Sequence, residues 1–126
     1  MNLDDYQKQV HDWCCEAFGE YAANDQIERQ HRFLEEALEL AQSLGTSHEE
    51  ALALVDYVYG RPIGEPSQEV GGVMVTLAAL CQPIKISIDE SMTTELNRIN
   101  QPEIIEKIRK KQAAKPANSP LPGPTE

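Results

Sequence analysis

The chain contains a long apolar stretch from Gln68 to Cys81, in which Glu69 is the only charged residue. Its length and its content of alanine and leucine favour a helix, although the β-branched residues within it also suit a strand. A helix that is apolar all round has to be covered on every side. The stretch therefore predicts a buried helix at residues 68–81 and self-association of the chain.

Apolar residues recur at steps of three and four along much of the remaining chain, which is the spacing of amphipathic helices. These stripes predict helices at residues 3–18, 27–44 and 48–59. Gly45 is placed to end the second of these helices, and Thr46 or Ser47 is placed to cap the third.

Proline and glycine mark the breaks in the second half of the chain. After the connector RPIGEPS, we expect Pro83 to end the helix at 68–81. The segment IKISI alternates like a strand, but five residues without a partner cannot form a sheet. Helix should resume near Asp89, restart at Pro102 and run to about Lys111.

The chain is long enough for one core and too short for two. We therefore expect an all-α domain of four to five helices at residues 1–115. A tail at residues 116–126 follows, and it holds four of the chain's eight prolines.

The charge balance excludes one class of partner. The 21 acids and 11 bases give a formal net charge of −10, whereas a protein that binds nucleic-acid phosphates should be basic. We expect no direct nucleic-acid partner. Residues 1–69 carry 15 acids and 4 bases, and a short basic patch lies within residues 105–115.

The sequence also predicts a cytoplasmic protein with no membrane partner. No apolar run approaches the roughly 20 residues that span a bilayer, and the N-terminus lacks the pattern of a secretory signal. The three cysteines, two of them adjacent at Cys14 and Cys15, form no disulfide framework and no zinc-binding spacing.

Three glutamates crowd one side of the helix predicted at 27–44. Glu35, Glu36 and Glu39 are separated by steps of one, three and four residues. Like charges three or four residues apart destabilise an isolated helix by about 0.2–0.5 kcal/mol per pair. The carboxylates either point into solvent or bind a hard divalent cation, and spacing alone leaves both interpretations open.

Two further acids stand in apolar segments. Glu69 either complements the N-terminal dipole of its helix or, if two helices pack side by side, completes a cage with Glu36 and Glu39. Asp56 is either a buried, hydrogen-bonded acid or a further ligand.

These acids also carry a family resemblance. Glu35, Glu36 and Glu39, followed by Glu69, resemble the EExxE…Exx(D) signature of the MazG-like, all-α nucleoside triphosphate pyrophosphohydrolases. Longer stretches resemble the dATP/dGTP pyrophosphohydrolase (MazZ-type) branch, which is found in phages, including those that replace adenine with 2-aminoadenine. The stretches are HRFLEEALELAQ, ALALVDYVYGRPIGEPSQEVGGVMVTLAALC, KIRKKQAAKP and SPLPG, and the match as a whole extends from about Trp13 to Gly123.

The resemblance implies a helical bundle, a homo-dimer or homo-tetramer, that uses two or more Mg²⁺ or Mn²⁺ ions to cleave a purine dNTP to dNMP and pyrophosphate. It matches Glu36 and Glu39 to the metal-binding pair, Glu35 to the leading acid of that motif, and Glu69 to the acid that opens the second motif. A phage enzyme of this branch would work in the host cytoplasm. It would lower the supply of dATP and provide dGMP for 2-aminoadenine synthesis.

One position departs from the family pattern. The wider family has an aspartate three residues after the acid of the second motif, and this chain has Gly72 there. Either the metal cage has one ligand fewer, or another acid supplies the missing ligand, for which Asp56 is the candidate. Gly71 and Gly72 suit either helix packing or the close approach of a nucleotide.

The basic patch supplies the remaining candidate residues. Its side chains either complement the dipole at the end of the last helix or neutralise a triphosphate. The resemblance favours Lys107 and Lys110 for the phosphates, with Arg109 as a third candidate. Trp13 and Phe33 are able to stack on a purine, but we expect both in the core.

The expected function is a metal-dependent dATP/dGTP pyrophosphohydrolase, and its purine preference comes from the resemblance alone. One alternative is a housecleaning pyrophosphohydrolase that acts on another dNTP. The other is a non-catalytic helical interaction protein whose acids lie on the surface.

Overall fold

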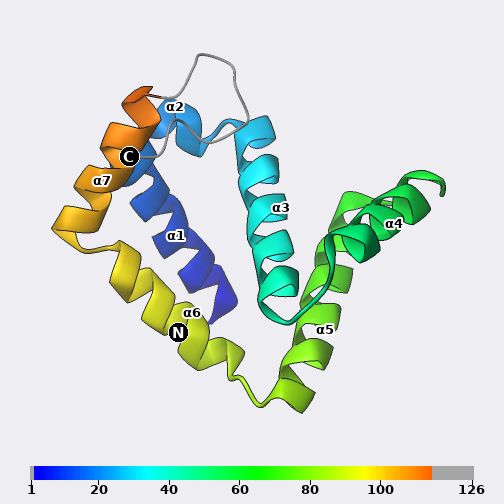
Figure 1. The fold of residues 1–126 in the computed structure, drawn as a ribbon. Helices are drawn as coiled ribbons and strands as arrows, with labels where there is room; N and C mark the ends of the chain where they lie inside the picture. The colour runs from blue at the N-terminus through cyan, green and yellow to red at the C-terminus, as the bar shows by residue number, and fades with distance from the viewer. Residues whose placement is uncertain (1, 115–126) are drawn as a thin grey trace. The chain divides into compact units, whose positions relative to one another are not determined.

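A computed structural model describes residues 2–114 of the chain (Figure 1). Its helices are α1 (Leu3–Phe18), α2 (Glu20–Ala23), α3 (Gln26–Ser43), α4 (His48–Tyr59), α5 (Pro66–Ile84), α6 (Ile88–Ile99) and α7 (Pro102–Ala114). No residue within 2–114 belongs to a strand, which confirms the all-α class. The described helices outnumber the four to five expected, and the predicted tail lies outside the described residues. The MazG-like bundle stays a prediction.

Side-chain caps explain where several helices begin and end. At the start of α1, the backbone N–H of Asp5 donates to Asn2 Oδ1 at 2.9 Å. At the start of α4, Ser47 and Glu50 exchange two side chain to backbone hydrogen bonds of 3.1 Å, which complete a capping box. Gly45 follows α3 with a φ of 97°, a conformation that glycine adopts without strain. The caps expected at both ends of the loop between α3 and α4 are therefore confirmed.

Two local features differ from the expectation. Pro83 does not end its helix, because a proline in the last turn removes a single hydrogen bond and α5 continues to Ile84. The end comes at Lys85, whose φ of 59° is left-handed. The short α2 was not expected, since four residues are too few to give a periodic apolar pattern.

The chain divides into two compact units. Unit 1 comprises Met1–Ala37 and Thr94–Glu126, of which residues 2–37 and 94–114 are described, and unit 2 comprises Leu38–Thr93. Helices α1, α2 and α7 belong to unit 1, and α4 and α5 belong to unit 2. Helices α3 and α6 each have residues in both.

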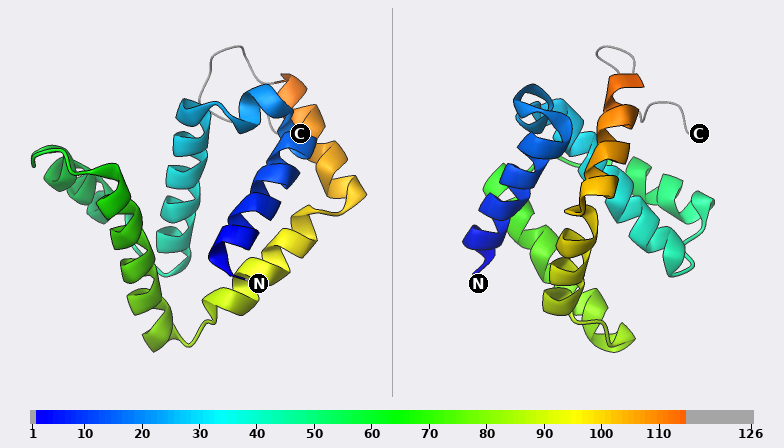
Figure 2. Two further views of the ribbon diagram at one scale, coloured as in Figure 1. Left: turned by 180° about the vertical axis from the view of Figure 1, so that it is seen from behind. Right: turned by 90° about the vertical axis from the view of Figure 1, so that its left-hand side faces the viewer.

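Unit 1 has a small core around α1, which packs along both α2 and α7. Figure 2 shows α1 and α7 side by side from two further directions. The buried apolar residues of this unit are Cys14, Ala17, Ala22, Ala23, Leu96 and Ile105. Half of them are alanines, so the helices approach closely but bury little apolar area each.

Trp13 joins α1 to the end of α6. Its indole N–H donates to the carbonyl oxygen of Ile99 at 2.9 Å, and its ring meets Phe18 edge to face with centroids 5.6 Å apart. Trp13 is half-buried, so the expected core position is met only in part. The same expectation is wrong for Phe33, which is 54% exposed.

Unit 2 has no comparable core. Cys81 is the only buried residue of Leu38–Thr93, and Val70 and Val75 on α5 are 66% and 69% exposed. The predicted burial of residues 68–81 is therefore wrong for the single chain, because no helix of unit 2 packs closely along another. Within residues 2–114, no single helix is long and apolar enough to cross a membrane.

We predict that Trp13→Phe lowers the free energy of unfolding by about 1–3 kcal/mol, because the smaller ring packs less well and the Ile99 carbonyl loses its donor. Urea unfolding followed by circular dichroism measures the change. Tyr21→Phe is the matched control, since Tyr21 is 86% exposed and should leave stability unchanged. Equal effects of the two substitutions would contradict the role given to Trp13.

Candidate functional site

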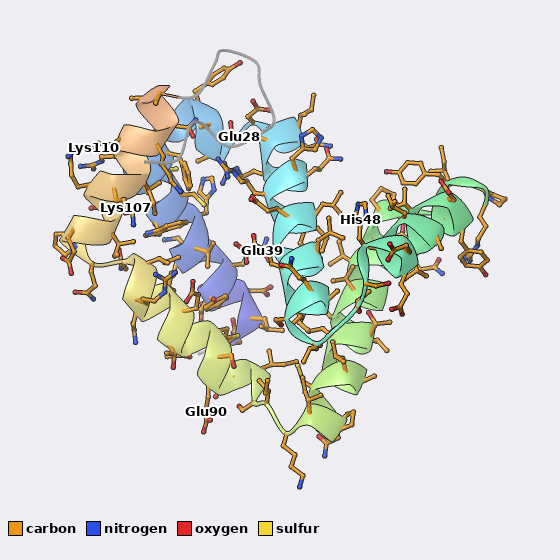
Figure 3. The ribbon with its side chains drawn as sticks, viewed as in Figure 1. Glu28, Glu39, His48, Glu90, Lys107 and Lys110 are labelled. Atoms are coloured by element: carbon orange, nitrogen blue, oxygen red, sulfur yellow. The ribbon has the colours of Figure 1, made fainter. Side chains whose placement is uncertain are left out.

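The three glutamates of the first motif lie on one continuous helix. Helix α3 runs unbroken from Gln26 to Ser43 and places Glu35, Glu36 and Glu39 on one side, as their spacing predicts. Figure 3 shows Glu39 on the same side of α3 as Glu28. Glu36 and Glu39 are exposed and Glu35 is half-buried, so at least two of the carboxylates are open to ions from solvent.

Glu35 already has a cationic neighbour one turn earlier on α3. Arg32 Nη1 lies 3.4 Å from Glu35 Oε1. An exposed pair at this spacing contributes about 0.3–0.5 kcal/mol. The charge of Glu35 is therefore partly compensated within its own helix.

A second arginine stands near Glu36 within unit 1. Arg98 on α6 binds Glu95 through two hydrogen bonds, Nε to Oε1 at 2.9 Å and Nη2 to Oε2 at 2.7 Å. Hydrogen bonding from Arg98 holds the pKa of Glu95 below its usual range. Glu95, with a smaller contribution from Glu36, raises the pKa of Arg98. Arg98 therefore compensates part of the negative charge on both glutamates.

Glu69 lies in the first turn of α5 but does not cap it. The carboxylate of Glu65 accepts the N–H groups of Ser67 at 3.1 Å and Gln68 at 2.8 Å, which is the N-cap role. The side chain of Glu69 instead lies against the backbone of Gly64, where an added Cβ would collide with its carboxylate. The missing side chain of Gly64 thus gives the Glu69 carboxylate its place in unit 2.

The other candidates of unit 2 are open to solvent. Asp56 on α4 is exposed, so its interpretation as a buried, hydrogen-bonded acid is wrong. An added Cβ at Gly71 or Gly72 would meet nothing within 4 Å. No neighbouring helix therefore accounts for the two glycines in the described structure.

The predicted metal cage draws on both units. Glu35 and Glu36 belong to unit 1, and Glu39, Asp56 and Glu69 belong to unit 2. In residues 2–114, no three His, Cys, Asp or Glu side chains are grouped closely enough to hold a metal ion. The donors fit the ion chemically, because Mg²⁺ and Mn²⁺ prefer carboxylate oxygens. The cage stays a prediction.

The basic residues of α7 fall into two groups. Lys107 and Lys110 are exposed and lie about one turn apart on the helix (Figure 3). Arg109 instead donates from Nε and Nη2 to the carbonyl oxygen of Glu16, at 3.1 and 3.0 Å. That carbonyl lies in the last turn of α1, where carbonyl groups lack partners within the helix. Arg109 thus ties α7 to α1, and the two lysines are the better placed for phosphate.

Sequence reasoning missed a buried charge at the start of α3. Glu28 is only 7% exposed, and its Oε1 lies 3.2 Å from Arg29 Nη2. The Arg29 guanidinium also stacks on the Phe18 ring, 4.7 Å from its centroid. Glu28 and Arg29 lie on the same side of α3 as the later acids, which could have indicated that they belong together. A charged side that faces solvent has the same spacing, so the sequence does not predict the burial of Glu28.

Comparison with known proteins gives no relative. The chain matches no family model, no curated protein and no solved structure. The resemblance of the motifs therefore supports a proposal and does not assign the chain to a family.

We predict that Arg98→Gln lowers the free energy of unfolding only slightly near neutral pH, since the pair with Glu95 is largely exposed. The folded-state pKa of Glu95 is depressed, so this stabilisation is present above the unfolded-state pKa and is lost as pH falls through the folded-state pKa. Urea unfolding of both proteins between about pH 7 and pH 3 should show the difference closing in acid. A difference that stays constant with pH would contradict this assignment.

Proposed function

We propose that this chain is a metal-dependent pyrophosphohydrolase that converts dATP and dGTP to the dNMP and pyrophosphate. The observation that carries the proposal is the row of Glu35, Glu36 and Glu39 along one side of α3, within a motif that resembles the MazG-like family. Glu69 at the start of α5 supports it as the acid that opens the second motif.

The proposed reaction breaks the bridge between the α- and β-phosphates. A water oxygen forms the new bond to phosphorus, its proton leaves to a base, and the pyrophosphate oxygens carry the released charge. Two or more Mg²⁺ or Mn²⁺ ions would supply charge neutralisation and a more acidic water. Glu36, Glu39 and Glu69 would hold these ions, with Asp56 in place of the aspartate that the family has at Gly72.

The remaining residues act on water and on phosphate. Glu35 or Glu39 would orient the water and accept its proton. Lys107 and Lys110 would bind the phosphate oxygens, since positioned cations do most of the work in phosphoryl transfer. Arg109 would support them by holding α7 on α1.

The proposed substrates and partners follow from the MazZ-type resemblance. The chain would act as a homo-dimer or homo-tetramer on free purine dNTPs, without nucleic acid or membrane. In a phage with 2-aminoadenine in its DNA, it would lower dATP and yield dGMP for synthesis of the modified base. A pyrophosphohydrolase for another dNTP is the nearest alternative.

A non-catalytic interaction protein is the second candidate function. The large exposed apolar surface of α4 and α5 favours it, because monomeric proteins rarely expose contiguous apolar patches beyond a few hundred Å². Gly72, which occupies the position of a family metal ligand, also favours a non-catalytic protein.

We predict that the purified chain, with Mg²⁺ or Mn²⁺, releases dNMP and pyrophosphate in equal amounts from dATP and dGTP. Ion-exchange chromatography of the products measures both. Glu36→Gln and Glu69→Gln should each lower kcat by about 100-fold or more, because each removes a carboxylate that holds the ions. Glu49→Gln, which removes an exposed acid of α4, is the control. Absence of turnover with every dNTP and both metals would refute the enzyme proposal.

We predict that Gly64→Ala raises the Mn²⁺ concentration for half-maximal activity by about tenfold, because the new methyl group displaces the Glu69 carboxylate. Stability should change by less than about 1 kcal/mol, since the atoms that move are the far end of a flexible side chain. Ile63→Ala is the matched control, because Ile63 is the preceding residue and is fully exposed. An unchanged metal requirement in Gly64→Ala would show that this contact does not position Glu69.

A further inference from the structure

An arginine at the end of α4 is held on an exposed aromatic ring. The Arg61 guanidinium carbon lies 4.9 Å from the centroid of the Tyr57 ring, and Tyr57 is 61% exposed. The backbone N–H of Arg61 donates to the carbonyl oxygen of Val58 at 3.2 Å. The last turn of α4 and the attraction between the cation and the ring therefore orient this side chain before any ligand binds.

The hydrogen-bond donors of Arg61 remain available. Its side chain is exposed, and none of the acids that the structure describes forms an ion pair with it. A guanidinium carries five N–H donors in a planar fork, which suits two acceptors that lie side by side. Because the fork is already oriented, a ligand that matches it loses little conformational entropy on binding.

The same stretch of unit 2 holds two of the proposed metal ligands. Asp56 directly precedes Tyr57, and the carboxylate of Glu69 lies against Gly64. Gly64 follows Arg61 by three residues, so their Cα atoms are at most about 11 Å apart. A nucleotide whose phosphates reach the metal ions could therefore bring its base to Arg61.

We propose that Arg61, oriented by the Tyr57 ring, selects a purine base by donating hydrogen bonds to its N7 atom. N7 is an acceptor in both adenine and guanine, and guanine presents O6 beside it. Neither pyrimidine has an atom equivalent to N7. Arg61 thus donates two parallel bonds to guanine and one to adenine. The inference rests on the proposed function, because it names the residue that recognises the base of the same substrate.

Replacement of a single atom of the nucleotide tests this contact. In 7-deaza-dGTP a C–H group takes the place of N7, which removes the acceptor. Titration calorimetry compares the Kd of dGTP with that of 7-deaza-dGTP. The measurement uses Ca²⁺, which takes the same oxygen ligands as Mg²⁺, to slow cleavage. We expect the wild type to bind 7-deaza-dGTP about tenfold more weakly.

Two pairs of variants assign the effect to Arg61 and its ring. Arg61→Gln should bind both nucleotides equally, whereas Lys85→Gln should keep the wild-type ratio. Lys85 is an exposed cation of the same unit at the opposite end of α5. Tyr57→Leu should reduce the ratio, because it removes the ring that orients Arg61. Tyr59→Leu is its control, since Tyr59 is 83% exposed and no arginine within residues 2–114 stacks on it.

The outcomes separate this inference from the proposed hydrolysis. Equal Kd values for dGTP and 7-deaza-dGTP in the wild type would overturn the inference, whether or not the chain releases pyrophosphate. An Arg61→Gln variant that weakens dGTP and dCTP by the same factor would also overturn it, because Arg61 would then bind the phosphates. Binding that depends on N7 without release of pyrophosphate would refute the hydrolysis alone. Absence of binding to any dNTP would refute both.

Discussion

The contacts of Arg29 with Phe18 and Glu28 fix the orientation of the start of α3 within unit 1. Burying a charge is costly unless it is paired, and this arginine is paired with a glutamate and stacked on an aromatic ring. The start of α3 is therefore held with Glu28 and Arg29 against the rest of unit 1. The side on which α3 carries Glu35 and Glu36 follows from that orientation, because these residues lie on the same helix within unit 1.

Much of the helical framework could be predicted, because local chemistry decides it. The capping box at Ser47, the glycine stop at Gly45 and the restart at Pro102 each depend on residues within one turn. Burial could not be predicted in the same way. Phe33 and the stretch 68–81 have the composition of a core, yet Phe33 and most of the stretch are exposed in the single chain, because burial depends on which other elements are available to cover them. The short α2 could not be predicted, because its four residues are too few to show a helical pattern of apolar residues.

The candidate site, too, could be predicted only where local spacing decides it. Helical spacing was enough to place three glutamates on one side of α3, and it does not say what surrounds them. The Arg98 side chain near Glu36 and the backbone of Gly64 against Glu69 bring together residues that no spacing rule connects. The expectation of purine substrates comes from a resemblance of motifs. The three glutamates on one side of α3 explain why such a chain would need cations.

If the acids of α3 bind divalent cations as proposed, a titration of Mn²⁺ into the full-length chain will detect the bound ions. Electron paramagnetic resonance measures the free Mn²⁺. We expect saturable binding of two or more ions per chain, weakened about tenfold or more by Glu36→Gln. Binding that is not saturable, or that is the same in the wild type and in Glu36→Gln, would contradict it.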